Sequence, residues 1–401
     1  MNMFPADRTL RIGTRSSPMA LAQVELVSEL LRKLDPDLVT EVHPVTTEAD
    51  LWQGDLAKLG GKGLFTKEID QLLQRGTVDM AVHCIKDVPG DVPLPDGLVF
   101  AAYLPRDDVH DVLLVPSASA VASLDDLPAG ASVGTSAVRR KAQLQRDRPD
   151  LNIVRVRGLV GTRVDKLDGA KGDVKLDAMV LAASGLERLG LADRARQVFT
   201  PEQILPAVGA GVLGLQCRRD DPAVAGLLVQ LNHEKTQREV TAERVMLHGL
   251  RGHCNSPVAG YCTTDPDGQL SLRGMVFNRD GSRFVHAHYW GERDNDPAVL
   301  GARVAAELLR QGARTIIEGI PHRDSRPAVL LRVATAGRGT TAVRGPSAPR
   351  PTRTAPTGHP VCRWRARAGW PTGGAGACRR PRRVDPKFWP AKGQRVSKIR
   401  V

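Results

Sequence analysis

The sequence predicts an α/β protein, and two observations support that fold class. Over the first 320 residues, short apolar segments of strand length alternate with segments whose apolar side chains recur at helical spacing. Most of the predicted strands are followed by a loop and then by a helix, an order typical of parallel, doubly wound sheets. A length of 401 residues is enough for two or three domains.

The first predicted strand spans residues 10–14, and a helix follows it directly. Ser17 is suited to the N-cap of that helix and Pro18 to its first turn. Apolar residues then recur at helical spacing, at Leu21, Val24, Val27, Leu31 and Leu34. A second helix is predicted over residues 64–75 and a second strand over residues 79–85.

Three further strands are predicted at residues 132–134, 153–156 and 178–182, each followed by a loop and a helix. The charged segment PRDDVHD, residues 105–111, separates them from the first group. We expect it to cross between two domains, and we expect residues 200–206 to cross back.

The remaining elements do not alternate in this way. Residues 222–249 are predicted to form a long helical stretch. Residues 259–290 favour antiparallel strands, since DPDG (265–268) and NRDG (278–281) are turn sequences. A helix over residues 298–311 closes this part.

The positive charge of the chain is concentrated in residues 321–401. This segment holds 19 Lys or Arg and two acids, whereas the rest has a net charge of −4 within a total of +13. Its composition is typical of a disordered cationic tail, and an out-of-frame C-terminus explains it equally well. The overall charge therefore gives no case for nucleic-acid binding by residues 1–320. Nucleic-acid binding by the tail is a separate hypothesis.

Membrane insertion and secretion are not expected. No apolar run is long enough to span a membrane, and the N-terminus lacks the apolar core of a secretory signal. The cysteines are far apart and lack paired spacing, which favours a reducing, cytoplasmic compartment over a disulfide framework. They are Cys84, Cys217, Cys254, Cys262, Cys362 and Cys378.

Polar residues follow the predicted strand ends, where ligands bind in doubly wound sheets. A single arginine there is more often a solvated surface residue, but six at corresponding positions favour a site for several carboxylates or phosphates. The arginines are Arg15, Arg139, Arg140, Arg157, Arg163 and Arg188, and the neighbouring hydroxyl residues are Ser16, Ser17, Thr135 and Ser136. The glycine-rich loop over residues 60–63 lacks the spacing of a nucleotide-binding loop.

Lys86 and Asp87 stand where the strand over residues 79–85 gives way to a loop. A carboxylate beside a lysine can stay ionised, accept protons or stabilise a developing cation. A surface Lys–Asp pair is the simpler interpretation.

Cys254 lies in the turn-rich stretch LRGHCNSPVAG, residues 250–260. Zinc needs about four ligands, and His253, Cys254 and Cys262 supply at most three. A Cys–His dyad is disfavoured because neighbours in extended chain point to opposite faces. Composition and spacing slightly favour an inert buried thiol, and attachment of a group is the fourth interpretation.

Eight ordered motifs resemble those of the porphobilinogen deaminase (hydroxymethylbilane synthase) family, over about residues 8–320. In chain order they are RIGTRSSPMALAQ, LGGKGLFTKEID, AVHCIKDVP, GTSAVRRKAQL, RGLVGTRVDKLD, ASGLERLGL, LPAVGAG and RGHCNSPVAG. The resemblance implies two doubly wound domains like the lobes of periplasmic binding proteins, a smaller α/β C-terminal domain with an antiparallel sheet, and a disordered or aberrant basic tail.

The resemblance also implies the domain limits. Residues 8–104 plus 202–221 form the cofactor and catalytic domain, and residues 105–201 form the arginine-rich substrate domain. Residues 222–320 carry the cysteine loop, and residues 321–401 are the tail.

The implied activity is that of a transferase that condenses four porphobilinogens head to tail with loss of ammonia. Hydrolysis then releases hydroxymethylbilane, an intermediate of tetrapyrrole and haem biosynthesis. The family carries one covalent dipyrromethane per chain, matched here to a thioether at Cys254, and is usually monomeric. The alternative is a non-catalytic anion-binding paralogue of the periplasmic-binding-protein type, which needs neither Cys254 nor Asp87.

The resemblance assigns a role to each candidate residue. Asp87 matches the catalytic aspartate. The positions matching cofactor-binding residues, besides Cys254, are Lys86, Ser17, Thr135, Ser136, Arg139, Arg140 and Arg163. Those matching substrate-binding residues are Arg15, Arg157, Arg188 and Ser16. The chain departs from the family pattern at Cys84, Leu159, Ala210 and His253, and none of these changes removes a charged catalytic group.

Overall fold

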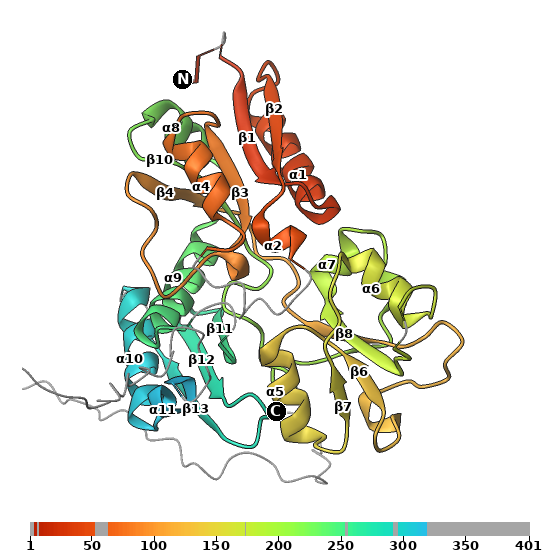
Figure 1. The fold of residues 1–401 in the computed structure, drawn as a ribbon. Helices are drawn as coiled ribbons and strands as arrows, with labels where there is room; N and C mark the ends of the chain where they lie inside the picture. The colour runs from red at the N-terminus through yellow and green to blue at the C-terminus, as the bar shows by residue number, and fades with distance from the viewer. Residues whose placement is uncertain are drawn as a thin grey trace, which may run out of the picture. The chain divides into compact units, whose positions relative to one another are not determined.

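Three β-sheets organise the chain in the computed structural model (Figure 1). It describes residues 4–5, 8–52, 63–172, 174–252, 256–291 and 296–318, which belong to one compact unit. Two sheets have five strands and the third has three, all flanked by helices, which confirms the predicted α/β fold class. Among these residues no helix is long and apolar enough to cross a membrane. The predictions for residues 321–401 lie outside the described residues.

The first sheet has the strand order β2-β1-β3-β10-β4. Its strands are β1 (Leu10–Arg15), β2 (Thr40–Val45), β3 (Met80–Cys84), β4 (Leu98–Tyr103) and β10 (Leu213–Arg218). Its helices are α1 (Pro18–Leu34), α2 (Glu48–Leu51), α4 (Lys67–Gln74) and the short 3-10 helix η1 (Ile85–Asp87). Ser17 caps α1 as predicted, since its side chain accepts a hydrogen bond from the Ala20 N–H.

The second sheet has the strand order β7-β6-β8-β5-β9. Its strands are β5 (Asp111–Leu114), β6 (Ser132–Gly134), β7 (Asn152–Val154), β8 (Ala178–Ala182) and β9 (Gln197–Val198). The helices near it are η2 (Leu124–Asp126), α5 (Val138–Asp147), α6 (Val160–Leu167), α7 (Ala183–Glu187) and η3 (Ala192–Arg194).

The two five-stranded sheets share one topology, and neither is wholly parallel. In each, the fourth strand runs antiparallel to its neighbours: β10 in the first sheet and β5 in the second. Each of these strands follows a segment that passes from the other sheet. The first crossing segment, residues 104–110, joins β4 to β5, and the second, residues 199–212, joins β9 to β10. The expected parallel order is therefore interrupted where the chain enters each sheet from outside.

The third sheet is antiparallel, with the order β11-β12-β13. Its strands are β11 (Val258–Thr264), β12 (Leu270–Phe277) and β13 (Phe284–Trp290), and the helices near it are α9 (Glu234–Gly249), α10 (Pro297–Arg310) and α11 (Ala313–Glu318). Helix α8 (Pro222–Val229) packs against β4 and β10 of the first sheet. Both predicted turns form: the Gly268 N–H donates to the Asp265 carbonyl (2.8 Å) and the Gly281 N–H to the Asn278 carbonyl (3.1 Å).

The single helical stretch predicted over residues 222–249 is wrong, because α8 and α9 are separate. The break lies against the edge strand β4. The Asn232 side-chain oxygen accepts from the Tyr103 N–H (3.0 Å), and the His233 N–H donates to the Tyr103 carbonyl (2.8 Å). The backbone of Tyr103 thus binds the residues between the two helices. Periodicity along the sequence does not reveal this contact.

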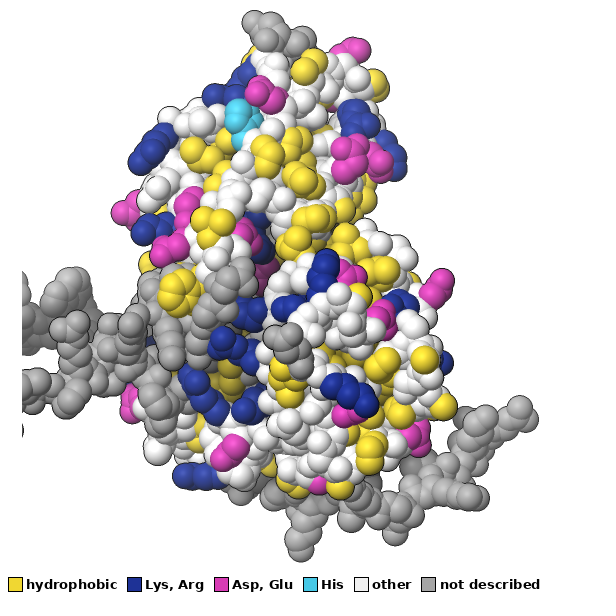
Figure 2. Space-filling model, turned by 45° about the vertical axis from the view of Figure 1, so that its right-hand side comes forward, with side chains coloured by type: hydrophobic (Ala, Val, Ile, Leu, Met, Phe, Trp, Pro, Cys, Tyr) yellow, Lys and Arg dark blue, Asp and Glu magenta, His cyan; other side chains and the backbone are white. Residues whose placement is uncertain are grey.

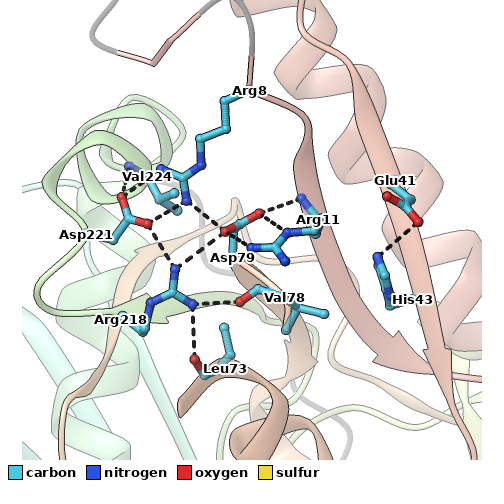
Figure 3. A network of polar contacts seen from close by, with 10 residues as sticks. All are labelled: Arg8, Arg11, Glu41, His43, Leu73, Val78, Asp79, Arg218, Asp221 and Val224. Atoms are coloured by element: carbon cyan, nitrogen blue, oxygen red, sulfur yellow. Dashed lines mark hydrogen bonds and ion pairs between the residues drawn. The ribbon is translucent and has the colours of Figure 1, made fainter. Parts of the chain in front are cut away.

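A buried charge network ties the first sheet together at the end opposite the Lys86–Asp87 loop (Figure 3). Asp79, whose side chain is fully buried, accepts hydrogen bonds from Arg11 Nε (2.9 Å) and from Arg8 Nη2 (2.7 Å). Arg8 and Arg218 also bind Asp221, the N-cap of α8. Burial alone would raise the pKa of Asp79, but the bonds from Arg11 and Arg8 hold it well below its usual value.

We predict that Asp79→Asn lowers the free energy of unfolding by about 3 kcal/mol at neutral pH, because removing one member of a buried ionic network leaves its partners uncompensated. Urea unfolding measures the change. Glu41→Gln is the control, since Glu41 is exposed and forms an ion pair with His43 on the same strand, β2, and it should cost less than about 1 kcal/mol. Equal, small losses of unfolding free energy in both variants would contradict the assignment of Asp79 to a stabilising buried ionic network.

Candidate functional site

One cleft brings together residues from all three sheets and from both crossing segments. Lys86 and Asp87 follow β3, and Arg139 and Arg140 lie on α5. The other residues that line it include Asp108, Asp111, Ser184, Ala210, Gly211, Leu247, Ser256 and Val258. Figure 2 shows Lys and Arg side chains, in dark blue, gathered near the middle of one face around a hollow in the surface. The cleft therefore combines cationic side chains with the carboxylate of Asp87.

Asp87 ends the short helix η1, so its side chain stands at the C-terminal edge of the first sheet. Arg15 lies beside it, with Nη1 3.9 Å from Oδ2. Arg15 itself forms an ion pair with Asp50 and lies over the Phe65 ring, 4.5 Å from its centroid. Asp87 is about one-third exposed, so it is open to a ligand while Arg15 is held from two sides.

His83 does not compete with Asp87 for protons. It is buried on β3, and its Nε2–H donates to the side-chain oxygen of Gln216 (2.8 Å). Burial lowers its pKa to about 4, so it is neutral at physiological pH. Asp87 is thus the group near this strand end that is suited to proton transfer or to stabilising a positive charge.

Arg139 and Arg140 share a buried acid, Asp111, the first residue of β5. Arg139 Nη2 lies 2.6 Å from one carboxylate oxygen and Arg140 Nη2 lies 2.8 Å from the other. Burial alone would raise the pKa of Asp111, but the two guanidinium groups lower it to about 2. Arg139 lines the cleft but is only 7% exposed, so its guanidinium group is largely engaged by Asp111.

The positive charge of Arg163 is disfavoured where it lies. Burial, together with the nearby positive charges of Arg140 and Arg157, lowers its pKa to about 10. Its Nε donates to the Gly158 carbonyl (2.7 Å), which holds the side chain in place. A bound anion would favour the charged form of Arg163 and so raise its pKa again. The adjacent helices α5 and α6 have Ala137 and Leu159 at their N-caps, which provide no side-chain cap, so backbone N–H groups there add to the positive potential.

The remaining predicted residues are not among those that line the cleft. Arg188 forms an ion pair with Asp107 and is the C-cap of α7. Ser16 and Ser17 are engaged locally, Ser16 with Thr46 (2.8 Å) and Ser17 as the α1 cap. Thr135 is buried and accepts from the Ala137 N–H (3.3 Å), and Ser136 is half-buried beside it.

The cysteine predicted to attach a group, Cys254, lies outside the described residues, as does His253. The next described residue along the chain is Ser256, which is buried and lines the cleft.

The described thiols are poorly suited to nucleophilic chemistry. Burial raises the pKa of Cys217 to about 11 and also raises that of Cys262. Burial and the charge of Asp87 raise the pKa of Cys84, whose sulfur accepts from Gln23 Nε2 (3.1 Å). Within the described ranges, no group of three or more His, Cys, Asp or Glu residues is placed to hold a metal ion.

Sequence reasoning missed Asp111, Asp108 and the residues that the third sheet and α9 contribute to the cleft, such as Leu247. The one available signal was the density of charge in PRDDVHD, which contains both aspartates. It was interpreted as a crossing alone, because the partners of these charges lie far away in the sequence.

Comparisons with known proteins identify relatives along the chain. The family model described as "Porphobilinogen deaminase, dipyromethane cofactor binding domain" matches residues 10–226, and the one described as "Porphobilinogen deaminase, C-terminal domain" matches residues 237–310. Porphobilinogen deaminase 2 of Streptomyces coelicolor is 52% identical over 317 residues, covering 79% of this chain and 99% of that protein.

Solved structures resemble the chain more distantly. The periplasmic aliphatic sulphonate binding protein SsuA from Escherichia coli is 16% identical with a TM-score of 0.32, covering 61% of this chain and 73% of that one. An ancestral cationic amino acid solute binding protein is 18% identical with a TM-score of 0.34, covering 56% and 87%.

We predict that the stabilisation provided by Asp111 depends on pH in the acid range. Its pKa is about 2 in the folded chain and about 3.9 when unfolded, so the stabilisation is complete above about pH 5 and declines as the pH falls toward 2. The difference in unfolding free energy between the parent and Asp111→Asn should narrow by up to about 1.4 kcal/mol per pH unit below pH 4. Urea unfolding at a series of pH values measures it. A difference that stays constant from pH 7 to pH 3 would refute the pairing.

Proposed function

The chain belongs to the porphobilinogen deaminase family, and from that premise we propose that the cleft described above is where its product is assembled. The family's function is the synthesis of hydroxymethylbilane from four porphobilinogens, with a dipyrromethane cofactor. The observation that carries the proposal is the convergence on one cleft of Asp87, the α5 arginines and Ser256, two residues after Cys254.

The described residues fit a dipyrromethane. Each of its rings bears an acetate and a propionate, and the cleft offers Arg140. Close to Arg140 is Arg163, whose pKa is depressed by burial and by the positive charges of Arg140 and Arg157. When bound, the cofactor supplies the pyrrole carbon that attacks the incoming substrate. We propose that Cys254 anchors it, and that the residues holding it are Lys86, Ser17, Thr135, Ser136, Arg139, Arg140 and Arg163. The hydroxyls of Ser17 and Thr135 are engaged locally, so these two would act through their backbone or by exchanging partners.

Substrate recognition is proposed for Arg15, Arg157, Arg188 and Ser16. Arg15 supports this role best among them, because its ion pair with Asp50 and its stacking on Phe65 fix the guanidinium group beside Asp87. A carboxylate of porphobilinogen bound there would bring the reacting aminomethyl carbon near Asp87.

Asp87 is proposed as the catalytic residue. Loss of ammonia leaves positive charge on the substrate, and a fixed carboxylate stabilises that charge as it develops. The same carboxylate can take the proton that the attacking ring must lose. Arg15 lies beside this carboxylate, with Nη1 3.9 Å from Oδ2.

The proposed enzyme is a monomeric, cytoplasmic transferase. The proposed domains are residues 8–104 plus 202–221, 105–201 and 222–320, which agree with the distribution of strands among the three sheets. The described cysteines are free thiols, which favours a reducing compartment. The alternative, a non-catalytic anion binder, leaves Asp87 and Cys254 without a role.

We predict that Cys254→Ser removes the covalent dipyrromethane and abolishes turnover, because the thiols of Cys84, Cys217 and Cys262 all have raised pKa values and are poor substitutes for it. Intact-protein mass measurement should show added mass on the parent and none on the variant. Cys84→Ser is the matched control and should keep both the added mass and the activity. Added mass that persists in Cys254→Ser would place the cofactor on another residue.

We predict that Asp87→Asn lowers kcat by at least about 100-fold and leaves folding intact, because the amide can neither take a proton nor offset positive charge. Steady-state kinetics with porphobilinogen and the thermal midpoint of unfolding measure the two effects. Asp96→Asn makes the same charge change at an exposed position near β4 and should retain full activity. Near-normal kcat in Asp87→Asn would remove Asp87 from the mechanism.

A further inference from the structure

The helix α9 contacts the loop that carries Asp87. Arg244 Nη2 donates to the Pro89 carbonyl (2.9 Å), and the His248 Nδ1–H donates to the Gly90 carbonyl (3.1 Å). Both carbonyls belong to the chain that immediately follows Asp87. A helix of the C-terminal part therefore holds the backbone of a loop that belongs to the first sheet.

The contact between Gly90 and Leu247 leaves no space for a side chain. A Cβ atom added to Gly90 would lie 2.3 Å from Cδ2 and 2.6 Å from Cγ of Leu247. The backbone of Gly90 has an ordinary conformation that alanine can adopt, since it is not among the positive-φ glycines. Glycine is thus required here by the closeness of Leu247 alone.

Leu247 also contacts the start of the segment that contains Cys254. The helix ends in a Schellman motif: the Arg251 N–H donates to the His248 carbonyl (2.9 Å) and the Gly252 N–H to the Leu247 carbonyl (3.1 Å). Arg251 takes the left-handed position, with φ of 51°, where glycine is usual. A Cβ added to Gly252 would lie 2.6 Å from Cδ1 of Leu247. The two methyl groups of one leucine therefore touch two loops.

Both loops belong to the cleft. Gly90 and Leu247 line it, and so does Ser256, the first described residue after Cys254. Only three residues separate Gly252 from Ser256. The side chain of Leu247 therefore connects the Asp87 loop to the start of the Cys254 segment.

We propose that Leu247 is a positioning residue that sets the separation between Asp87 and the group carried by Cys254, with Arg244 and His248 holding the Asp87 loop against it. The inference rests on the proposed roles of Asp87 and Cys254. It adds a specific requirement: the carboxylate and the tethered primer are aligned through one side chain, because misplacement of about 1 Å can cost on the order of 100-fold in rate.

The test is a double-mutant cycle in the complete enzyme. Gly90→Ala should push the Asp87 loop away from α9 and lower kcat by about 10- to 100-fold. The KM for porphobilinogen should stay near the parent value because the arginines are not moved, and the dipyrromethane content should stay near the parent value because the proposed attachment to Cys254 is covalent. Leu247→Ala in the Gly90→Ala background restores the space and should recover most of kcat, so the two changes are not additive.

A matched control separates positioning from packing. Gly249→Ala lies on the same helix, and its new Cβ would meet Ala305 of α10 at 2.8 Å, so it strains the packing of α9 without touching the Asp87 loop. It should lower the thermal midpoint of unfolding and leave kcat unchanged. If Gly90→Ala fails to fold, Leu247→Ala alone should still lower kcat at unchanged cofactor content, because the contacts of Leu247 with the two loops are lost.

Four results would overturn the proposal: full kcat in Gly90→Ala, no recovery in the double variant, an equal loss of kcat in Gly249→Ala, or, where Gly90→Ala does not fold, full kcat in Leu247→Ala. Failure of the proposed function itself has a different signature, since the parent enzyme would then lack turnover or a cofactor on Cys254.

Discussion

The charged side chains of the first crossing segment hold the cleft together. Arg106 is buried and pairs with Glu243 of α9, with Nη1 2.8 Å from Oε1. Glu243, which has no exposed surface, also accepts from the Gly209 N–H (2.7 Å) in the second crossing segment and from the Cys262 N–H (2.8 Å) in β11. One carboxylate thus joins both crossing segments to the third sheet. A buried charge of this kind is tolerated because its partners are in place, and losing one of them is costly.

Acidic residues of the first crossing segment and of the strand that follows it, β5, pair with some of the arginines near the cleft. These pairs determine which cationic side chains remain to bind a ligand. Asp111 neutralises Arg139 and shares Arg140, and Asp107 pairs with Arg188. Positive charge is therefore disfavoured at Arg163, where burial acts together with repulsion from Arg140 and Arg157. An anionic ligand relieves that repulsion, and a growing chain with two carboxylates on each ring provides such an anion. Asp87 lies close enough to Arg163 to favour its charged form, so a carboxylate stands in a site where positive charge must develop.

Much of the fold could be predicted from local pattern. The strand ending at Arg15, the Ser17–Pro18 start of α1 and the turns at residues 265–268 and 278–281 follow from side-chain periodicity and turn chemistry. The antiparallel β5 and β10 could not, because strand direction depends on where the crossing segments enter each sheet. The break before α9 depends on Tyr103, far away in the sequence.

The sequence could predict an anion-binding site, but it could not predict the ion pairs within that site. Arginines at strand ends pointed to an anion, whereas the engagement of Arg139 by Asp111 is a tertiary contact that spacing cannot reveal. The family resemblance supplied the roles of Asp87 and Cys254, which neither composition nor spacing favoured. Leu247 had no signal at all, since an apolar residue on a helix is ordinarily core.

The central claim is that one chain grows on Cys254 inside the cleft. The most direct test is peptide mapping of enzyme mixed with limiting porphobilinogen and quenched during turnover. The account predicts a ladder of species separated by one substrate unit less ammonia, all on the peptide that contains Cys254. A ladder on a different peptide, or turnover with no covalently bound intermediates, would contradict it.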